Sequence, residues 1–157
     1  MDNKDESIIR VLRRRAGLSS RTLSRMLGIP ISTVHRRIKR MEQKGIITGY
    51  KALINFEKTA WSIGALALIN LTEMIPGKGH IPKRDIVQSL SRLEKIEEIM
   101  EVQAANFDLA LKARFVSLKK LGEFIESLRS IKGIEETSSA IITEEMVLSP
   151  KPHFSRE

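Results

Sequence analysis

The stretch that decides the fold of the first part of the chain is STVHRRIKRME, residues 32–42. Its apolar residues Val34, Ile38 and Met41 are spaced by four and then three positions, which places them on one face of an α-helix. The basic residues between them fall on the opposite, solvent side. The pattern predicts a helix that begins at residue 31 or 32 and ends at Gly45, with one buried stripe and one basic face.

Two shorter helical patterns precede this stretch. Residues 5–14 and 21–27 both carry apolar residues at helical spacing, and Ser19 or Ser20 can cap the second of these helices. Gly28-Ile29-Pro30 then forces a sharp turn, because Gly admits a positive φ and Pro cannot continue the helix behind it. Three short helices, the last two joined by a tight Gly-containing turn, are typical of a helix-turn-helix.

The net charge of +8 is unevenly distributed along the 157 residues. Residues 1–60 contain 14 Lys and Arg against 5 Asp and Glu, whereas residues 61–157 contain 13 against 14. All the excess positive charge therefore lies in the first two-fifths of the chain. Such a surface attracts polyanions with a strong dependence on salt, although a solvated basic face is the simpler interpretation of charge alone.

The arrangement of the basic residues favours duplex DNA as the polyanion. The third helix of a helix-turn-helix enters the major groove with its N-terminal residues against the base edges. Arg bonds guanine bidentately, while Ser and Thr adapt to several bases. A purely structural three-helix bundle is the alternative, and His35 is either a base contact or an ordinary surface histidine. The candidate DNA-binding residues are Ser20, Arg21, Ser32, Thr33, His35, Arg36, Arg37, Lys39 and Arg40.

From residue 45 the helical pattern gives way to an extended one, and from Trp61 strands and helices alternate. Strands are predicted at residues 63–72, 99–104, 109–115 and 134–143, with helices at 82–93 and between Ser117 and Gly133. The glycines of the loop at residues 73–81 do not form a P-loop, because no Gly-Lys-Ser/Thr opens the next helix. The fold class is therefore α+β: a helix-turn-helix domain, winged-helix-like, an extended linker, and a βαββαβ ferredoxin-like domain.

Several other classes of protein find no support. Cysteine is absent, which excludes disulfides and thiolate metal sites, and no two of His35, His80 and His153 have a metal-ligand spacing. Acidic pairs such as Glu97-Glu98 are adjacent, so they point to different sides of any regular element and do not form a general acid–base pair. We expect no catalysis, no cofactor and no metal. No apolar run approaches the length of a membrane span and the start is polar, so we expect a cytoplasmic, nucleoid-associated protein.

The same stretch carries a family resemblance. STVHRRIKRME at 32–42, followed by GIITGY at 45–50 and preceded by LGI at 27–29, closely resembles the Lrp/AsnC (feast/famine) regulators of bacteria and archaea. The resemblance covers roughly residues 4–146, and the chain is identified as a member of that family, of archaeal type. One departure is Pro30, where the family usually places Ser or Thr. Proline is compatible with a helix start, and Ser32 or Thr33 can replace the lost cap.

The resemblance implies both an assembly and a ligand. It implies dimers and often larger rings, up to octamers, in which the linker forms a strand that helps to pair two DNA-binding modules. It also implies an amino-acid effector bound between neighbouring dimers. Asp108 would receive the α-amino group, although Asp108 equally fits a turn cap. Ala105 stands where the family has Gly, and its methyl group occupies space near the expected ligand. The candidate effector residues are Ala105, Phe107, Asp108, Gly133, Thr137 and Ser139.

The predicted organisation has four parts. These are a DNA-binding domain at residues 1–50, a linker strand at 51–60, an oligomerisation and effector domain at 61–146, and a tail at 147–157. Antiparallel sheets backed by helices on one side can pair through their other faces, which favours a homodimer. The predicted function is a sequence-specific transcription regulator that binds pseudo-palindromic sites. The alternatives are an architectural protein that wraps DNA with little sequence preference, and a metabolite sensor whose DNA binding is vestigial.

Overall fold

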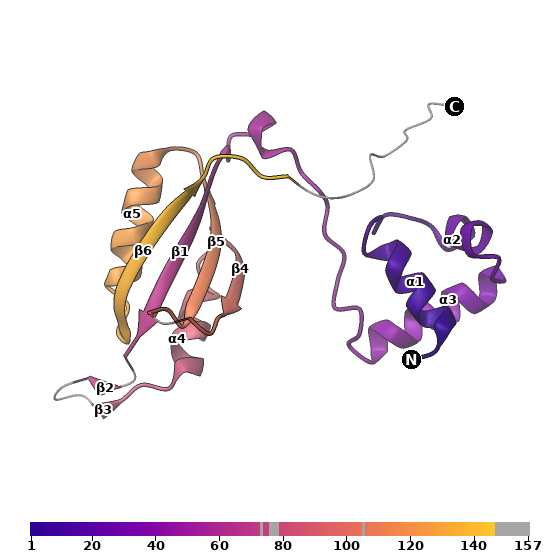
Figure 1. The fold of residues 1–157 in the computed structure, drawn as a ribbon, viewed down its shortest axis with the longest axis horizontal. Coiled ribbons are helices and arrows are strands. Elements are labelled where there is room, and N and C mark those ends of the chain that lie inside the picture. The colour runs from indigo at the N-terminus through magenta and orange to yellow at the C-terminus, as the bar shows by residue number, and fades with distance from the viewer. Residues whose placement is uncertain (73, 76–78, 105, 147–157) are drawn as a thin grey trace. The chain divides into compact units, whose positions relative to one another are not determined.

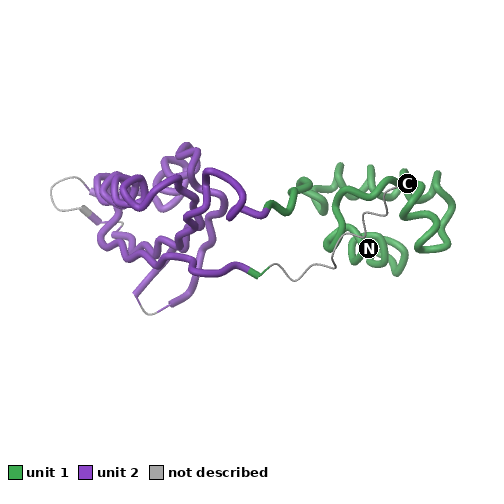
Figure 2. Tube along the Cα trace, turned by 90° about the horizontal axis from the view of Figure 1, so that it is seen from above, with its two compact units in different colours: residues 1–54, 146–157 green, residues 55–145 purple. Residues whose placement is uncertain are grey.

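The computed structural model describes residues 1–72, 74–75, 79–104 and 106–146. The chain divides into two compact units, one formed by residues 1–54 and the other by residues 55–145 (Figure 2). Each unit has its own hydrophobic core.

The first unit consists of three helices, α1 (Asn3–Leu12), α2 (Ser20–Leu27) and α3 (Ile31–Gln43) (Figure 1). Their core contains Ile8, Leu23, Val34 and Met41, each at most 1% exposed. Every one of the three predicted helices is present, with ends that differ by one or two residues from the sequence-based bounds. The buried stripe predicted for α3 is also confirmed, with Ile38 packed at its margin.

Local hydrogen bonds fix where these helices begin and end. Asp2 caps α1 through a capping box with Asp5, and Ser19, not Ser20, caps α2 by accepting from the Thr22 N–H at 3.2 Å. Gly28 ends α2 in the left-handed conformation at φ 64°, as the turn requires. The first residue outside α3 is Pro30, and no side chain caps this helix. The expectation that Ser32 or Thr33 replaces the missing cap is therefore wrong.

The segment after α3 differs from the sequence-based prediction. We predicted a linker strand at residues 51–60, but the structure has no strand there and forms a 3₁₀ turn at Phe56–Lys58 instead. Residues 1–54 likewise contain no strand that would form a wing. A strand requires a partner to complete its backbone hydrogen bonds, and among the described residues no segment pairs with this linker. The Tyr50 hydroxyl donates to Glu42 Oε1 at 2.7 Å, which ties the start of the linker to α3.

The second unit is built on a four-stranded antiparallel sheet in the order β4-β5-β1-β6 (Figure 1). The strands are β1 (Ile63–Leu71), β4 (Ile96–Glu101), β5 (Leu109–Phe115) and β6 (Ile134–Ile142), and the helices are α4 (Lys83–Leu90) and α5 (Leu118–Arg129). The predicted βαββαβ fold is confirmed. β4 begins and ends about three residues earlier than predicted, because the turn before β5 is longer than expected.

The structure also contains a short hairpin that the sequence analysis did not predict. Met74–Ile75 and Gly79–His80 form the two-residue strands β2 and β3, which pair within the segment predicted as a plain loop. Such short strands carry no periodic signal that could be detected in a sequence. Residue 73, residues 76–78 and the predicted tail at 147–157 lie outside the described residues. Among the helices that the structure describes, none has the length and apolar character needed to cross a membrane.

The two faces of the sheet differ in how they are covered. Ala65, Ala67 and Ile69 of β1 face the helices and are at most 2% exposed. The alternate residues Leu66 and Leu68 point to the other face, where Leu68 lies opposite Ala110 on one side and Ser138 on the other. Neither α4 nor α5 covers this second face, which we call the open face, and Phe56 of the 3₁₀ turn packs against Arg114 at one end of it.

Candidate nucleic-acid interface and effector region

The outer side of α3 gathers most of the predicted DNA-binding residues. Ser32, His35, Arg36, Lys39 and Arg40 are all exposed, whereas Val34 and Met41 of the same helix are buried. Thr33 lies half-buried at the margin of this surface. The alternation arises because an apolar stripe at a spacing of four and three residues leaves the rest of the helix to solvent. The helix therefore presents hydrogen-bond donors and positive charge along one continuous face.

The start of α2 adds two more of the predicted residues. Arg21 is exposed and Ser20 is half-buried, both in the first turn of the helix. Ser19 directly before them is occupied as the helix cap. The first turn of a helix presents backbone N–H groups and the positive end of the helix dipole, which is a favourable place for a phosphate group. Arg21 is therefore placed where it can add a side-chain contact to the same phosphate.

Arg37, which we expected near the phosphates at the groove wall, bonds two carboxylates of its own unit. Its Nη1 lies 2.8 and 2.7 Å from the two carboxylate oxygens of Asp2 and 2.7 Å from Asp5 Oδ1. Only 15% of its side chain is exposed. Arg37 lies next to the buried stripe of α3, on the side that meets α1, and so it forms part of the contact between these helices. The sequence analysis did not consider these acidic partners, and a DNA contact of Arg37 stays a prediction.

Asp2 and Asp5 are functional candidates that the sequence analysis missed. Asp5 also accepts from Arg40 Nη2 at 2.6 Å, so its carboxylate joins both arginines while its side chain is only 3% exposed. The hydrogen bond from Arg37 holds the pKa of Asp2 at about 2, below its usual value. The same arginine lowers the pKa of Asp5, and the two carboxylates raise the pKa of Arg37. The signal that could have revealed this cluster is an Asp-x-x-Asp pair in an otherwise basic unit.

In the second unit, three of the predicted effector residues converge on the end of β1. Asp108 accepts from the Leu71 N–H through Oδ2 at 2.8 Å, and the Gly133 carbonyl accepts from the Thr72 N–H at 2.9 Å. Thr137 lies opposite Ile69 in the sheet. Phe107 immediately precedes this cluster and is half-buried. Ala105 lies outside the described residues, so the expected effect of its methyl group is not addressed by the structure.

The polar groups of this region are only partly engaged. The Asp108 carboxylate is already bonded to backbone, as the turn-cap interpretation predicts. Thr137 is 8% exposed, and its Oγ1 has no hydrogen-bond partner. Ser139 is exposed, two positions further along β6. A buried hydroxyl without a partner is costly, and a ligand or water could supply the missing bond.

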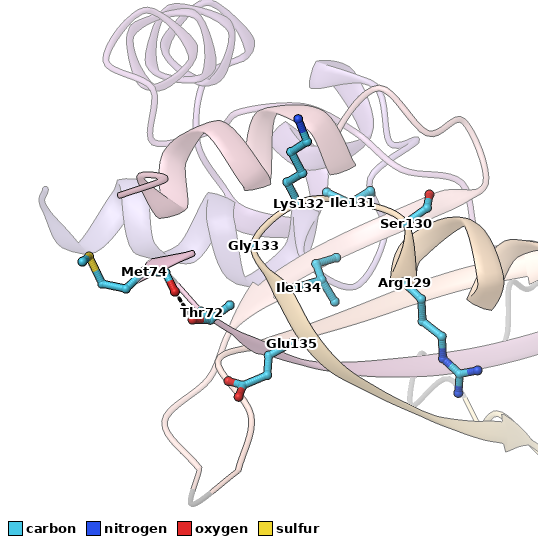
Figure 3. A pocket seen from close by; sticks show the side chains of 9 residues that line it. All are labelled: Thr72, Met74, Arg129, Ser130, Ile131, Lys132, Gly133, Ile134 and Glu135. Carbon is cyan, nitrogen blue, oxygen red and sulfur yellow. Dashed lines mark hydrogen bonds between the residues drawn. The ribbon is translucent and has the colours of Figure 1, made fainter. Parts of the chain in front are cut away.

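A hollow of about 560 Å³ lies beside these residues, at the turn between α5 and β6 (Figure 3). Of the predicted effector residues it includes only Gly133, which has a φ of 92°. The positive φ favours glycine at this position, and a Cβ there would lie 2.5 Å from Ile86 Cδ1, so the Ile86 side chain would have to shift. The remaining lining residues are Thr72, Met74, Arg129, Ser130, Ile131, Lys132, Ile134 and Glu135.

A charged cluster at one end of the open face was also missed by the sequence analysis. Arg114 of β5 pairs with Glu97 at 3.3 Å and with Glu145, and its guanidinium carbon lies 3.8 Å from the centre of the Phe56 ring. Lys112 pairs with Glu145 as well, and these two cations lower the pKa of that carboxyl group. The cluster therefore joins β4 and β5 to the segments that enter and leave the second unit. No group of three metal-ligating side chains occurs among the described residues.

A three-helix unit with a basic outer helix, joined to a βαββαβ unit, defines a two-domain helix-turn-helix DNA-binding protein. Residues 1–48 match the model of the winged helix-turn-helix DNA-binding family, and residues 80–152 match the Lrp/AsnC ligand binding domain. The HTH-type transcriptional regulator FL11 of Pyrococcus abyssi is 31% identical over 144 residues, which cover 90% of this chain and 89% of the relative. The chain belongs to the Lrp/AsnC family of transcriptional regulators, and resembles its archaeal members.

Solved structures show the same fold. The structure of AsnC from E. coli superposes with a TM-score of 0.72 at 20% identity, over 96% of this chain and 97% of that one. A transcriptional regulator from Neisseria meningitidis, crystallised as a complex with L-Met, superposes with a TM-score of 0.78 at 21% identity. This comparison covers 95% of this chain and 94% of the other. The predicted family and the predicted fold class are thus both confirmed.

Proposed function

We propose that this regulator binds pseudo-palindromic DNA sites as a homodimer or larger oligomer, with α3 of each subunit in a major groove. The observation that carries the proposal is the outer face of α3, where Ser32, His35, Arg36 and Lys39 are exposed together. These residue types bond base edges and phosphates, and their neighbours Val34 and Met41 anchor the helix to the unit. The site of action that we propose is chromosomal DNA, so we also propose that the protein works in the cytoplasm, at the nucleoid.

The missing cap of α3 supports the same role. Because Pro30 provides no side-chain hydrogen bond, the first-turn N–H groups of this helix are not capped by the preceding residue. The positive end of the helix dipole favours an anion at that point. A DNA phosphate there would complete the helix start, and Ser32 would lie beside it.

The open face of the second unit supports the homodimer. Leu66 and Leu68 are half-buried on this face, and Met100 is 39% exposed. In the register of the sheet, Ala110 lies between Leu68 and Met100, and Ala140 lies beside Leu66 on the edge strand β6. A second copy of the sheet would cover this apolar strip and leave the charged cluster of Arg114 at its end. Pairing two subunits through the second units would place two copies of α3 on one DNA molecule.

We expect replacement of Arg36 by Ala to cost about 1–3 kcal/mol in binding to a selected DNA site and to relax the preference at one base position in each half-site. The reason is that Arg36 is exposed in the N-terminal half of α3, and this half of a recognition helix contacts the base edges. Binding isotherms on the selected site and on single-base variants measure the effect. Arg92→Ala, an exposed arginine of the second unit, is the matched control. An equal loss on all sequences would show that Arg36 contacts only phosphate.

We further propose that an amino acid modulates the regulator by binding near the end of β1. The support is the unpartnered Thr137 hydroxyl, the adjacent Asp108 and Gly133, and the match to the Lrp/AsnC ligand binding domain. The regulator from Neisseria meningitidis, which was crystallised with L-Met, shares the fold. Titration calorimetry with each of the twenty amino acids is expected to detect at least one ligand. Thr137→Val should abolish that heat, since it removes the hydroxyl and keeps the shape. Heat that is unchanged in this variant would place the ligand elsewhere.

A further inference from the structure

The Asp5 carboxylate lies at the junction between α1 and the recognition helix α3. One of its oxygens accepts from Arg37 Nη1 at 2.7 Å and the other accepts from Arg40 Nη2 at 2.6 Å. The Asp5 side chain is 3% exposed, yet both of its arginine partners belong to the helix that we place in the DNA groove. A nearly buried carboxylate thus contacts two consecutive turns of that helix.

The two arginines use this carboxylate differently. Arg37 gives its Nη1 to Asp2 and Asp5 and retains only 15% side-chain exposure, so its charge is neutralised within the unit. Arg40 makes a single bond to Asp5 and retains 48% side-chain exposure. The guanidinium group of arginine is planar and carries five N–H donors, so a bond on one edge leaves the other edge available and fixes its direction. Asp5 therefore bonds one part of the Arg40 guanidinium group, while nearly half of the Arg40 side chain stays exposed.

The negative charge of Asp5 affects DNA binding in two opposite ways. A carboxylate close to a DNA-binding surface repels phosphate, so removing it would strengthen binding if charge were all that mattered. Fixing the direction of Arg40 has the opposite effect, because an arginine that is already oriented loses less side-chain freedom when it binds phosphate. Repulsion and orientation thus predict opposite changes in affinity for the same substitution.

We propose that Asp5 is a positioning residue for DNA binding: it orients Arg40 so that one edge of the guanidinium group bonds the carboxylate and the other bonds a DNA phosphate. Asp2 and Arg37 complete the contact that sets α3 against α1. The inference rests on the proposed function, because it assumes that α3 enters the DNA groove.

The test compares Asp5→Asn with Glu6→Gln in the full-length protein. Both substitutions remove one negative charge from α1, but Glu6 is exposed and its side chain bonds neither arginine. Affinity for a selected DNA site is measured against salt concentration, at a temperature where circular dichroism shows each variant fully folded. Asp5→Asn is expected to bind about tenfold more weakly, with a salt slope reduced by about 0.9, the loss of one phosphate contact. Glu6→Gln should bind as tightly as the wild type or slightly more tightly.

Arg40→Lys provides a second test, which does not depend on the folding of Asp5→Asn. Arg40→Lys retains the charge but replaces the planar fork by a compact ammonium group, which cannot hold Asp5 on one edge and present a second edge to phosphate. Its affinity should fall several-fold. Where Asp5→Asn folds, adding it to Arg40→Ala should cause little further loss, because the carboxylate acts through that arginine.

Three results would overturn the proposal. These are a folded Asp5→Asn protein that binds as tightly as Glu6→Gln, an Arg40→Lys protein with unchanged affinity, and losses that simply add in the double variant. Failure of the proposed function has a different signature, since the wild-type protein would then show no salt-dependent binding to DNA.

Discussion

Replacing Leu68 with Asp is expected to make the protein monomeric and to weaken its binding to a full pseudo-palindromic site by about 10²–10⁴-fold. Leu68 lies at the centre of the open face, between Ala110 and Ser138 in the register of the sheet. In a homodimer that pairs through this face, the new carboxylate would be desolvated without a partner. The monomer keeps its α3 surface and can still bind one half-site. Its affinity for the full site falls because it no longer binds both half-sites at once. Sedimentation velocity and a DNA-binding isotherm measure the two effects.

The matched control is Leu118→Asp. Leu118 is 58% exposed in the first turn of α5, away from the open face, and an acidic residue is favourable at the start of a helix. This variant should sediment and bind DNA like the wild type. If Leu68→Asp remained a dimer, the subunits would pair through another surface. A monomeric Leu68→Asp protein with full affinity would show instead that pairing is not required for DNA binding.

Replacing Val34 with Asp is expected to unfold the first unit and abolish DNA binding while the second unit stays folded and dimeric. Val34 is fully buried in α3, and an unpaired buried carboxylate costs at least about 3 kcal/mol. A unit of about 50 residues has little stability to lose. The two units have separate cores, so the effect should not spread. Circular dichroism should show partial loss of helix, and sedimentation should still show a dimer.

Met26→Asp tests whether the added charge alone has this effect. Met26 lies on α2 and is 51% exposed, so a carboxylate there stays in water. Its circular dichroism should match that of the wild type, and its melting temperature should fall only slightly, because an exposed acidic residue near the end of a helix costs less than about 1 kcal/mol. Cooperative loss of both units in Val34→Asp would contradict the division of the chain into independent domains, which we propose at the junction of residues 54 and 55.

Most of the fold could be predicted because its elements carry strong periodic signals. The stripe of Val34, Ile38 and Met41 defined α3, and the alternation of strands with amphipathic helices gave the βαββαβ order. We predicted that the linker at residues 51–60 forms a strand, but these residues contain no strand in the structure. An apolar extended pattern indicates that a segment can form a strand, but it does not show whether another strand is present to pair with it. The β2–β3 hairpin was missed because two-residue strands have no measurable period.

The site was less predictable, because it depends on contacts between residues far apart in the sequence. The outward positions of Arg36 and Lys39 follow from helical spacing alone, and the structure agrees with them. Whether a basic residue on the flank of the helix faces DNA or the protein depends on what packs beside it. Arg37 meets Asp2 and Asp5 across more than 30 residues of sequence, and no local pattern contains that information. The same holds for Arg114. It contacts Phe56 and Glu145, which lie near the first and last residues of the second unit in the sequence.

Selection of bound sequences from a random duplex library by the wild-type protein, at physiological salt, decides whether this regulator reads base sequence. We expect enrichment of a pseudo-palindrome whose half-sites are separated by about 10 base pairs or a multiple, since two copies of α3 enter major grooves on one face of the duplex. Retention of the library without enrichment of any sequence would contradict it, and would indicate a protein that wraps DNA without reading it.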